Sequence, residues 1–78
     1  MIQWCRTGTF EVKRETDVSR TVTHAISWTT FATYTCSGTG YGRDTYRVAE
    51  ITYTTIKLGA FTFGSDHNVT IMAVGIGW

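Results

Sequence analysis

The stretch VTIMAVGIGW, residues Val69 to Trp78, is the part of the sequence that decides the fold class. Alternate side chains of a β-strand point to opposite faces, so Val69, Ile71 and Ala73 share one face. A small antiparallel domain normally keeps one face of each strand in water and alternates apolar with polar residues. Here both faces are apolar, so we expect each to be covered, and the pattern leaves open which one faces the core. The second face carries Met72, Val74, Ile76 and Trp78.

The chain is short for a stable domain, with 78 residues. A domain of this size buries only about 60–65% of the surface that its unfolded chain exposes. We therefore expect an additional source of stability, namely a disulfide, a structural metal or a partner chain. Cys5 and Cys36 allow at most one disulfide, and no CxxC pair or His/Cys cluster indicates structural zinc. Oligomerisation is therefore the expected supplement.

Charge and apolar runs exclude two classes of partner. The net charge is +1, from seven Lys and Arg against six Asp and Glu, and it gives no long-range field for nucleic acid or anionic membrane. The opening MIQWCRTGTF lacks the basic start and apolar run of a signal peptide, and no apolar stretch reaches the length of a membrane-spanning helix. We expect a soluble protein made in the cytoplasm, with no nucleic acid partner and no membrane insertion.

The composition is typical of strands. The chain has 16 Thr, 11 aromatic residues and 8 Gly but a single Leu, and no window has helical spacing with caps. Short apolar segments separated by turn signals predict one all-β domain over residues 1–78, a small antiparallel β-sandwich or barrel of six or seven strands. The expected strands cover residues 1–5, 9–13, 18–28, 31–36, 45–52, 56–63 and 69–78.

Two of these strands change phase along their length. Tyr46 and Val48 share one phase while Ala49 and Ile51 share the other, which indicates a bulge or a second buried face. Within 56–63, Ile56 and Leu58 share one phase while Phe61 and Phe63 share the other. The change falls at Gly59, and a glycine at this point fits a bulge.

Taken in order, four motifs resemble the C-terminal domain of bacteriophage and prophage tail fibres. They are MIQWC, VTHAISWTTF, YRVAEITYTTIKLGAFTF and MAVGIGW. In that family an I-I-Q-W-G opening precedes a V-T-F-P-I-A-F-like strand, then R-V-x-x-V-x-T-T-x-F-T-V, then a W-I-A-I-G-Y ending. His24 and Ala25 stand where the family has Phe-Pro, and Cys5 where it has Gly. The matching positions are Ile2, Gln3, Trp4, Val22, Thr23, Ile26, Trp28, Arg47, Val48, Ile51, Thr54 to Ile56, Ala73, Ile76, Gly77 and Trp78.

The resemblance implies a homotrimer that recognises a bacterial surface receptor, such as a polysaccharide, a lipopolysaccharide or another outer-membrane receptor. The face with Met72, Val74, Ile76 and Trp78 would then pack against neighbouring protomers. The protein would be part of the virion tail fibre, assembled in the reducing host cytoplasm. Its cysteines would stay reduced, with a Cys5–Cys36 disulfide as the alternative. The ending is also similar, more weakly, to the H-type lectins, six-stranded trimeric sandwiches that bind sugars near subunit boundaries.

Two polar turns carry the residue types that sugar recognition needs, namely aromatic faces and short polar groups on loops. These are the glycine-rich SGTGYGRD, residues 37–44, which has the composition of a mobile connection, and the later turn SDHN. An ordinary solvated turn is the alternative at each place. Tyr34 and Tyr46 lie on strands, in the core or at an interface, and Arg47 is either solvated or paired across subunits with Glu50 or Asp44. The receptor candidates are Tyr41, Arg43, Asp44, Asp66, His67 and Asn68, beside Ser65.

Nothing in the sequence assembles a catalytic site or a cofactor site. Ser65, Asp66 and His67 have the residue types of a hydrolytic triad, but adjacent residues point in divergent directions. The G-x-G pattern precedes a strand rather than a phosphate-binding helix. His24 is expected to be packed or hydrogen-bonded, and the alternative is an axial metal ion held by three copies of His24 or of His67.

The sequence therefore supports a non-enzymatic receptor-binding tip as its leading hypothesis. The alternatives are a structural trimerisation cap without receptor contact and a monomeric small β-barrel binding module. An enzyme comes last.

Overall fold

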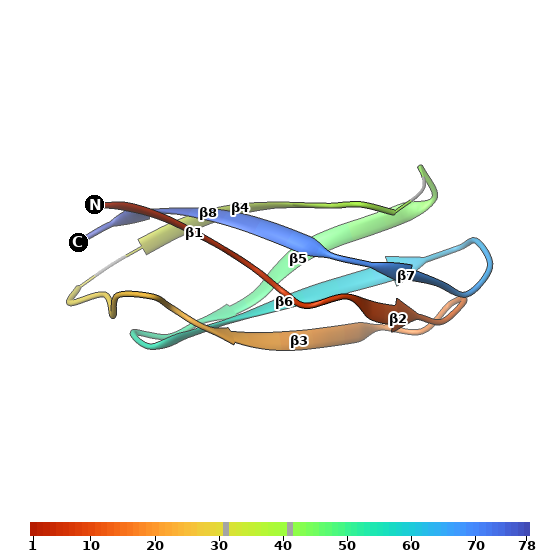
Figure 1. Cartoon of the computed structure of the whole chain (residues 1–78), viewed down its shortest axis with the longest axis horizontal. Helices are drawn as coiled ribbons and strands as arrows, with labels where there is room; N and C mark the ends of the chain where they lie inside the picture. Colours follow the sequence, from red (N-terminus) through yellow and green to blue (C-terminus); the bar gives the residue numbers. More distant parts are fainter. Residues whose placement is uncertain (31, 41) are drawn as a thin grey trace.

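The structure of the protein is a computed structural model that describes residues 1–30, 32–40 and 42–78. These residues form eight β-strands joined by turns and loops (Figure 1). All named strand pairs are antiparallel. The described residues contain no helix, and therefore no helix that could span a membrane. The all-β antiparallel fold is confirmed. The strands are β1 (Ile2–Arg6), β2 (Phe10–Val12), β3 (Val18–Thr23), β4 (Ala32–Gly38), β5 (Asp44–Ile51), β6 (Thr55–Thr62), β7 (His67–Val69) and β8 (Ile71–Gly77).

One strand more than the upper expectation of seven is present, because His67 and Asn68, predicted as a turn, pair with β2 and form β7 together with Val69, and the ladder is interrupted at Thr70. The backbone N–H of Thr70 donates to the Thr39 hydroxyl at 3.0 Å, and its carbonyl accepts from the Thr39 N–H at 3.1 Å. On either side of this point the chain changes partners: β7 pairs with β2, and β8 pairs with β1 and β4.

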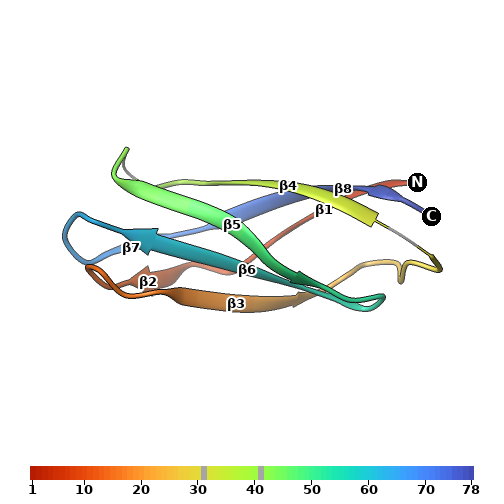
Figure 2. The same ribbon diagram turned by 180° about the vertical axis from the view of Figure 1, so that it is seen from behind.

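Two three-stranded sheets, β1-β8-β4 and β3-β6-β5, form the sandwich, and β2 and β7 form a separate pair. Figures 1 and 2 show the two sheets as layers of an elongated molecule, 39 Å along its longest axis. Both chain termini and the β5–β6 turn lie at one end, which we call the terminal end. The β4–β5 and β6–β7 connections lie at the opposite end, which we call the far end.

The core lies between the two sheets and is built from alternate residues of β6 and β8. Ile56 and Leu58 from one sheet and Ile71 and Ala73 from the other are almost completely buried. Gly75 continues this face of β8, and a Cβ at Gly75 would come within 2.5 Å of the Tyr34 ring, so the ring packs directly on the backbone. The face of β8 that the sequence left open is therefore settled: Ile71 and Ala73 point inward.

One expected bulge is confirmed and the other is wrong. The β5–β6 register shifts between Val48 and Glu50, so the phase change in β5 is a bulge. At Gly59 the pairing is continuous, with Gly59 opposite both Ser19 and Arg47. The Arg47 guanidinium lies over Gly59 on the outer face, where a Cβ would come within 2.8 Å of its carbon, so glycine lets the arginine lie close to the strand.

The expected strand over 18–28 ends at Thr23. The N–H of His24 still donates to the carbonyl of Thr54 at 2.8 Å, in register with the β3–β6 pairing, and the chain leaves the ladder after it. The amide of Gln3 bonds both backbone groups of Ile26, at 2.7 and 3.2 Å. The Ile26 side chain is exposed, whereas the His24 side chain is buried, so the two do not point to the same face.

Candidate functional site

Asp44 and His67, two of the predicted receptor residues, meet at the far end. Asp44 begins β5 and His67 begins β7, and the His67 Nε2 lies 2.7 Å from the Asp44 Oδ2. The Asp44 side chain is only 1% exposed and that of His67 11%. The contact is therefore a buried pair that ties two connections of the sandwich together.

Hydrogen bonding sets the protonation state of His67. Its Nε2 faces a carboxylate oxygen, and its Nδ1 lies 2.6 Å from the Ser65 carbonyl oxygen. With Asp44 ionised, neither acceptor has a proton to donate, so the two contacts favour a ring that is protonated on both nitrogens. The bond to the Ser65 carbonyl, followed by the bond to Asp44, raises the pKa of His67 above its ordinary value.

The environment of Asp44 stabilises its ionised form. Burial acts to raise the pKa of Asp44, but the nearby Thr62 hydroxyl and the hydrogen bonds of His67 and Tyr46 outweigh burial, so the pKa is lowered. Thr62 lies opposite Asp44 in the β5–β6 register without reaching hydrogen-bond geometry: within the described chain the buried Oδ1 atom of Asp44 has no hydrogen-bond partner.

Tyr46 extends this cluster to the glycine-rich connection. Its hydroxyl donates to the Asp44 Oδ2 at 2.9 Å and accepts from the Gly40 N–H at 2.7 Å. Its ring lies on Gly38, where a Cβ would come within 2.2 Å. The predicted mobile loop over 37–44 is thus shorter, because β4 extends to Gly38, and it is anchored at Gly40. We call Gly40, Asp44, Tyr46 and His67 the Asp44 cluster.

The other receptor candidates divide between exposed and engaged side chains. Arg43 and Asn68 are exposed. Asp66 is exposed, and its Oδ1 accepts from the Arg14 N–H at 2.8 Å. Tyr41 lies outside the described residues. The Asp44 carboxylate is enclosed, and its bond to His67 holds two connections of the far end together.

No triad forms from Ser65, Asp66 and His67. The His67 Nδ1 bonds the carbonyl of Ser65, and the His67 Nε2 bonds Asp44 instead of Asp66. This agrees with the argument that adjacent turn residues cannot align a nucleophile with its base.

His24 is buried and hydrogen-bonded, as expected. The Trp28 Nε1–H donates to the Tyr34 hydroxyl at 3.0 Å, and this hydroxyl lies 2.8 Å from the His24 Nδ1. The His24 Nε2 lies 3.1 Å from the Thr52 carbonyl. Both ring nitrogens of His24, like those of His67, are engaged within the chain, and no group of three metal-ligating side chains exists among the described residues. The geometry does not favour the axial-metal alternative.

The two cysteines lie too far apart for a disulfide within one chain. Cys5 and Cys36 both pair with Ala73, from opposite sides of β8. Two strand spacings separate their Cα atoms by roughly 10 Å, and a disulfide requires less than about 7 Å. Both are free and half-buried, and burial raises the pKa of each thiol.

Within the single chain, Arg47 forms an ion pair with Asp17. Its Nη1 lies 3.1 Å from the Asp17 Oδ1, while Asp44 is held by His67. Both partners are largely exposed, so the pair contributes at most about 1 kcal/mol.

The outer face of β1 and β8 is apolar and uncovered in the single chain. The predicted interface residues of this face, from Met72 to Trp78, are 44–66% exposed. The register places Ile2 beside Ile76 and Trp4 beside Val74, and sequence reasoning missed these two β1 residues although they alternate with Gln3 and Cys5. The apolar face thus comprises Ile2, Trp4, Met72, Val74, Ile76 and Trp78.

The outer face of the other sheet differs in character. It presents polar and charged side chains such as Thr21, Arg47 and Lys57, all exposed. Such a face is stable in contact with water and needs no partner, whereas the apolar face of β1 and β8 is stabilised when a partner covers it.

Comparisons with protein-family models, with curated proteins and with solved structures give no match for this chain.

Proposed function

We propose that this domain is the homotrimeric tip of a bacteriophage tail fibre and that it binds a bacterial surface receptor, a polysaccharide or lipopolysaccharide. The observation that carries the proposal is the apolar face of β1 and β8. Six large apolar side chains, each 44–70% exposed, gather on one side of the sandwich. A contiguous exposed apolar face of this kind marks an interaction surface.

A second copy of the chain is the partner that best fits this face. The domain is small and lacks an internal disulfide, and oligomerisation is a usual supplement for a domain of this size. The resemblance to tail-fibre tips supports three copies around an axis, each contributing the same face.

The polarity of the molecule supports receptor contact at the far end. Both termini lie at the terminal end, so a fibre shaft joined to the N-terminus would leave the far end pointing outward (Figure 1). Arg43 and Asp66 are exposed there on connections that the Asp44 cluster holds in place, and Asn68 is exposed on β7. Exposed polar groups on a rigid scaffold are suited to binding.

Sedimentation velocity at micromolar concentration tests the assembly, and adsorption of the labelled protein to a panel of bacterial strains tests the adhesion. We expect a trimer that adsorbs to some strains and not to others. A stable monomer would contradict the account of the apolar face.

A trimerisation cap without receptor contact is the second candidate. It is favoured by the enclosure of Asp44 and His67, which removes two predicted receptor contacts. A trimer that adsorbs to no strain of the panel would favour the cap over the adhesin.

A further inference from the structure

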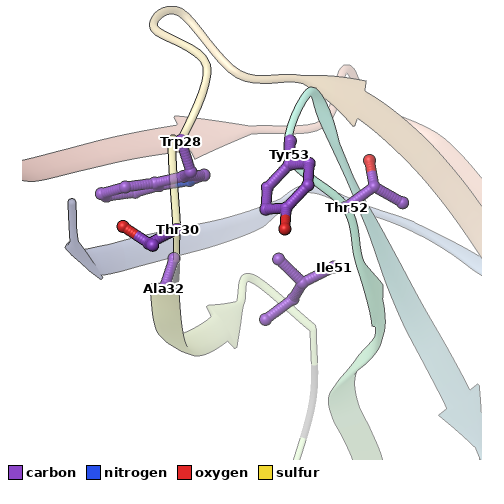
Figure 3. A pocket seen from close by; sticks show the side chains of 6 residues that line it. All are labelled: Trp28, Thr30, Ala32, Ile51, Thr52 and Tyr53. Atoms are coloured by element: carbon purple, nitrogen blue, oxygen red, sulfur yellow. The ribbon is translucent and has the colours of Figure 1, made fainter.

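A pocket of about 460 Å³ opens at the terminal end, away from the predicted receptor turns. Figure 3 shows Trp28, Thr30 and Ala32 along one side of it and the end of β5 with the β5–β6 turn along the other. This volume lies within the range of roughly 300–1,000 Å³ found for small-molecule sites. The lining residues are Trp28, Thr30, Ala32, Ile51, Thr52 and Tyr53.

The pocket exists because two edge strands separate. β4 and β5 each pair with a single neighbour. They lie close together at the far end, where Tyr46 bonds Gly40, and diverge toward the terminal end in both views of the molecule (Figures 1 and 2). The β5 bulge between Val48 and Glu50 lies just before the pocket, and bulges bend the strand that carries them. The pocket is thus a consequence of the strand geometry.

The two walls of the pocket are held rigidly. Trp28 is 3% exposed, and its indole N–H is bonded to Tyr34. The backbone N–H of Trp28 donates to the Tyr53 carbonyl at 2.9 Å, which joins one wall to the other. The Thr52 hydroxyl accepts from the Thr55 N–H at 2.9 Å and closes the turn that carries Tyr53. Binding would therefore cost little ordering of the protein.

The lining combines aromatic surface with hydroxyl groups and contains no charged side chain. The Trp28 and Tyr53 rings supply apolar surface from opposite walls (Figure 3). The Thr52 hydroxyl is used within the turn by Thr54 and Thr55. The Thr30 hydroxyl donates to the Trp78 carbonyl at 3.0 Å and can still accept a hydrogen bond, and the Tyr53 hydroxyl can donate and accept. A charged ligand would be desolvated without a counter-charge.

We propose that this pocket binds one uncharged pyranose ring. A pyranose has a C–H-rich face that stacks on an aromatic ring and a neutral hydroxyl edge that can donate to the Thr30 hydroxyl and pair with the Tyr53 hydroxyl. Tyr53, 62% exposed on a closed turn, is the stacking residue. The assignment of that sugar to a bacterial surface glycan rests on the proposed function, whereas the affinity of the pocket for sugar is measured without cells.

The direct test is an NMR titration of the ¹⁵N-labelled protein with methyl glycosides of glucose, galactose, mannose and N-acetylglucosamine. We expect at least one glycoside to bind with a millimolar Kd and to shift the Trp28 indole N–H and the Tyr53 amide. Tyr53→Ala should weaken this binding about tenfold or more, which is ~1.4 kcal/mol or more. Ala32→Leu, which fills the pocket, should weaken it as well.

Phe63→Ala is the matched control, because Phe63 is also an exposed aromatic, 56% exposed, but follows β6 at the far end. It should bind the glycoside like the unmodified protein. The proposal is overturned if no glycoside shifts these resonances, if Tyr53→Ala binds as well as Phe63→Ala, or if indole binds in the pocket while the sugars do not.

Strain adsorption separates this proposal from the proposed function. Loss of glycoside binding in Tyr53→Ala with unchanged adsorption supports the pocket and assigns the receptor to another surface. Adsorption by a protein that binds no glycoside rejects the pocket and leaves the proposed function standing.

Discussion

The ring of His67 lies between a carbonyl and a carboxylate, and its charge is therefore part of the fold. Because the pKa of His67 is raised, its contribution to stability is fully present below its unfolded value of 6.5 and is lost as the pH rises through the folded pKa. The pKa of Asp44 is lowered, so its contribution is present above 3.8 and is lost as the pH falls through the folded pKa. The pair stabilises the domain most between these limits.

Asp44→Asn tests this account at the residue scale. Urea unfolding at a series of pH values should show the free energy of unfolding of the unmodified protein falling as the pH rises above 6.5. The fall should be smaller in Asp44→Asn, and at pH 6 that variant should be less stable by about 1–3 kcal/mol. Asp17→Asn, at an exposed ion pair, should keep the original pH dependence. Identical profiles for all three proteins would contradict the role of the pair.

Gly75 gives a second prediction at the same scale. A Cβ at Gly75 would meet the buried Tyr34 ring, which is fixed by its hydrogen bonds to Trp28 and His24. Gly75→Ala should therefore lower the free energy of unfolding by about 1–3 kcal/mol. At Gly8 a Cβ meets nothing within 4 Å, so Gly8→Ala should be neutral or stabilising by up to about 1 kcal/mol. Thermal unfolding of both variants measures the difference, and equal melting temperatures would contradict it.

At the scale of elements, β8 has one face in the core and one on the surface, and substitutions separate the two. Val74→Asp lies on the outer face, 44% exposed, so the protomer can accommodate the charge. A trimer that buries this face would have to desolvate three carboxylates near each other. We expect the variant to sediment as a folded monomer with a strand-type circular dichroism spectrum. Thr21→Asp, on the polar outer face of β3, should remain a trimer, and dissociation of both variants alike would count against the interface.

The elements also show what local sequence can predict. The apolar character of both faces of β8 and the phase change in β5 follow from apolar periodicity, because each strand carries its own pattern. The break at Thr70 is accompanied by bonds to Thr39, and the Arg47 side chain covers Gly59, so both positions are contacted by residues distant in the sequence. Such contacts are set by tertiary pairing, which the periodicity of one segment does not contain.

At the scale of the whole molecule, the candidate sites show the same division. The sequence identified Asp44 and His67 as polar turn residues, but their burial follows from β5 and β7 beginning side by side, 23 residues apart in the chain. The pocket likewise needs Trp28 and Tyr53, which the β4–β5 divergence places on opposite walls. The sequence identifies the types of residue in these sites, but it does not predict which of them come into contact in the folded chain.

The molecule is elongated, and the proposed function places receptor contact at its far end. If the far end meets the receptor, the double variant Arg43→Ala with Asn68→Ala should lose adsorption to a sensitive strain about tenfold or more. It should remain a trimer, because neither residue belongs to the apolar face. Adsorption by flow cytometry and sedimentation of the same samples measure both properties.

Thr21→Ala and Tyr53→Ala complete this comparison, because Thr21 lies on the side of the sandwich and Tyr53 at the terminal end. If only the far-end variant loses adsorption, the receptor meets the connections that the Asp44 cluster holds. If Tyr53→Ala loses adsorption and the far-end variant keeps it, the receptor contact lies in the pocket, and the far end serves the fold alone. Unchanged adsorption in all three variants would leave neither end as the receptor surface, since each variant removes exposed groups without touching the core.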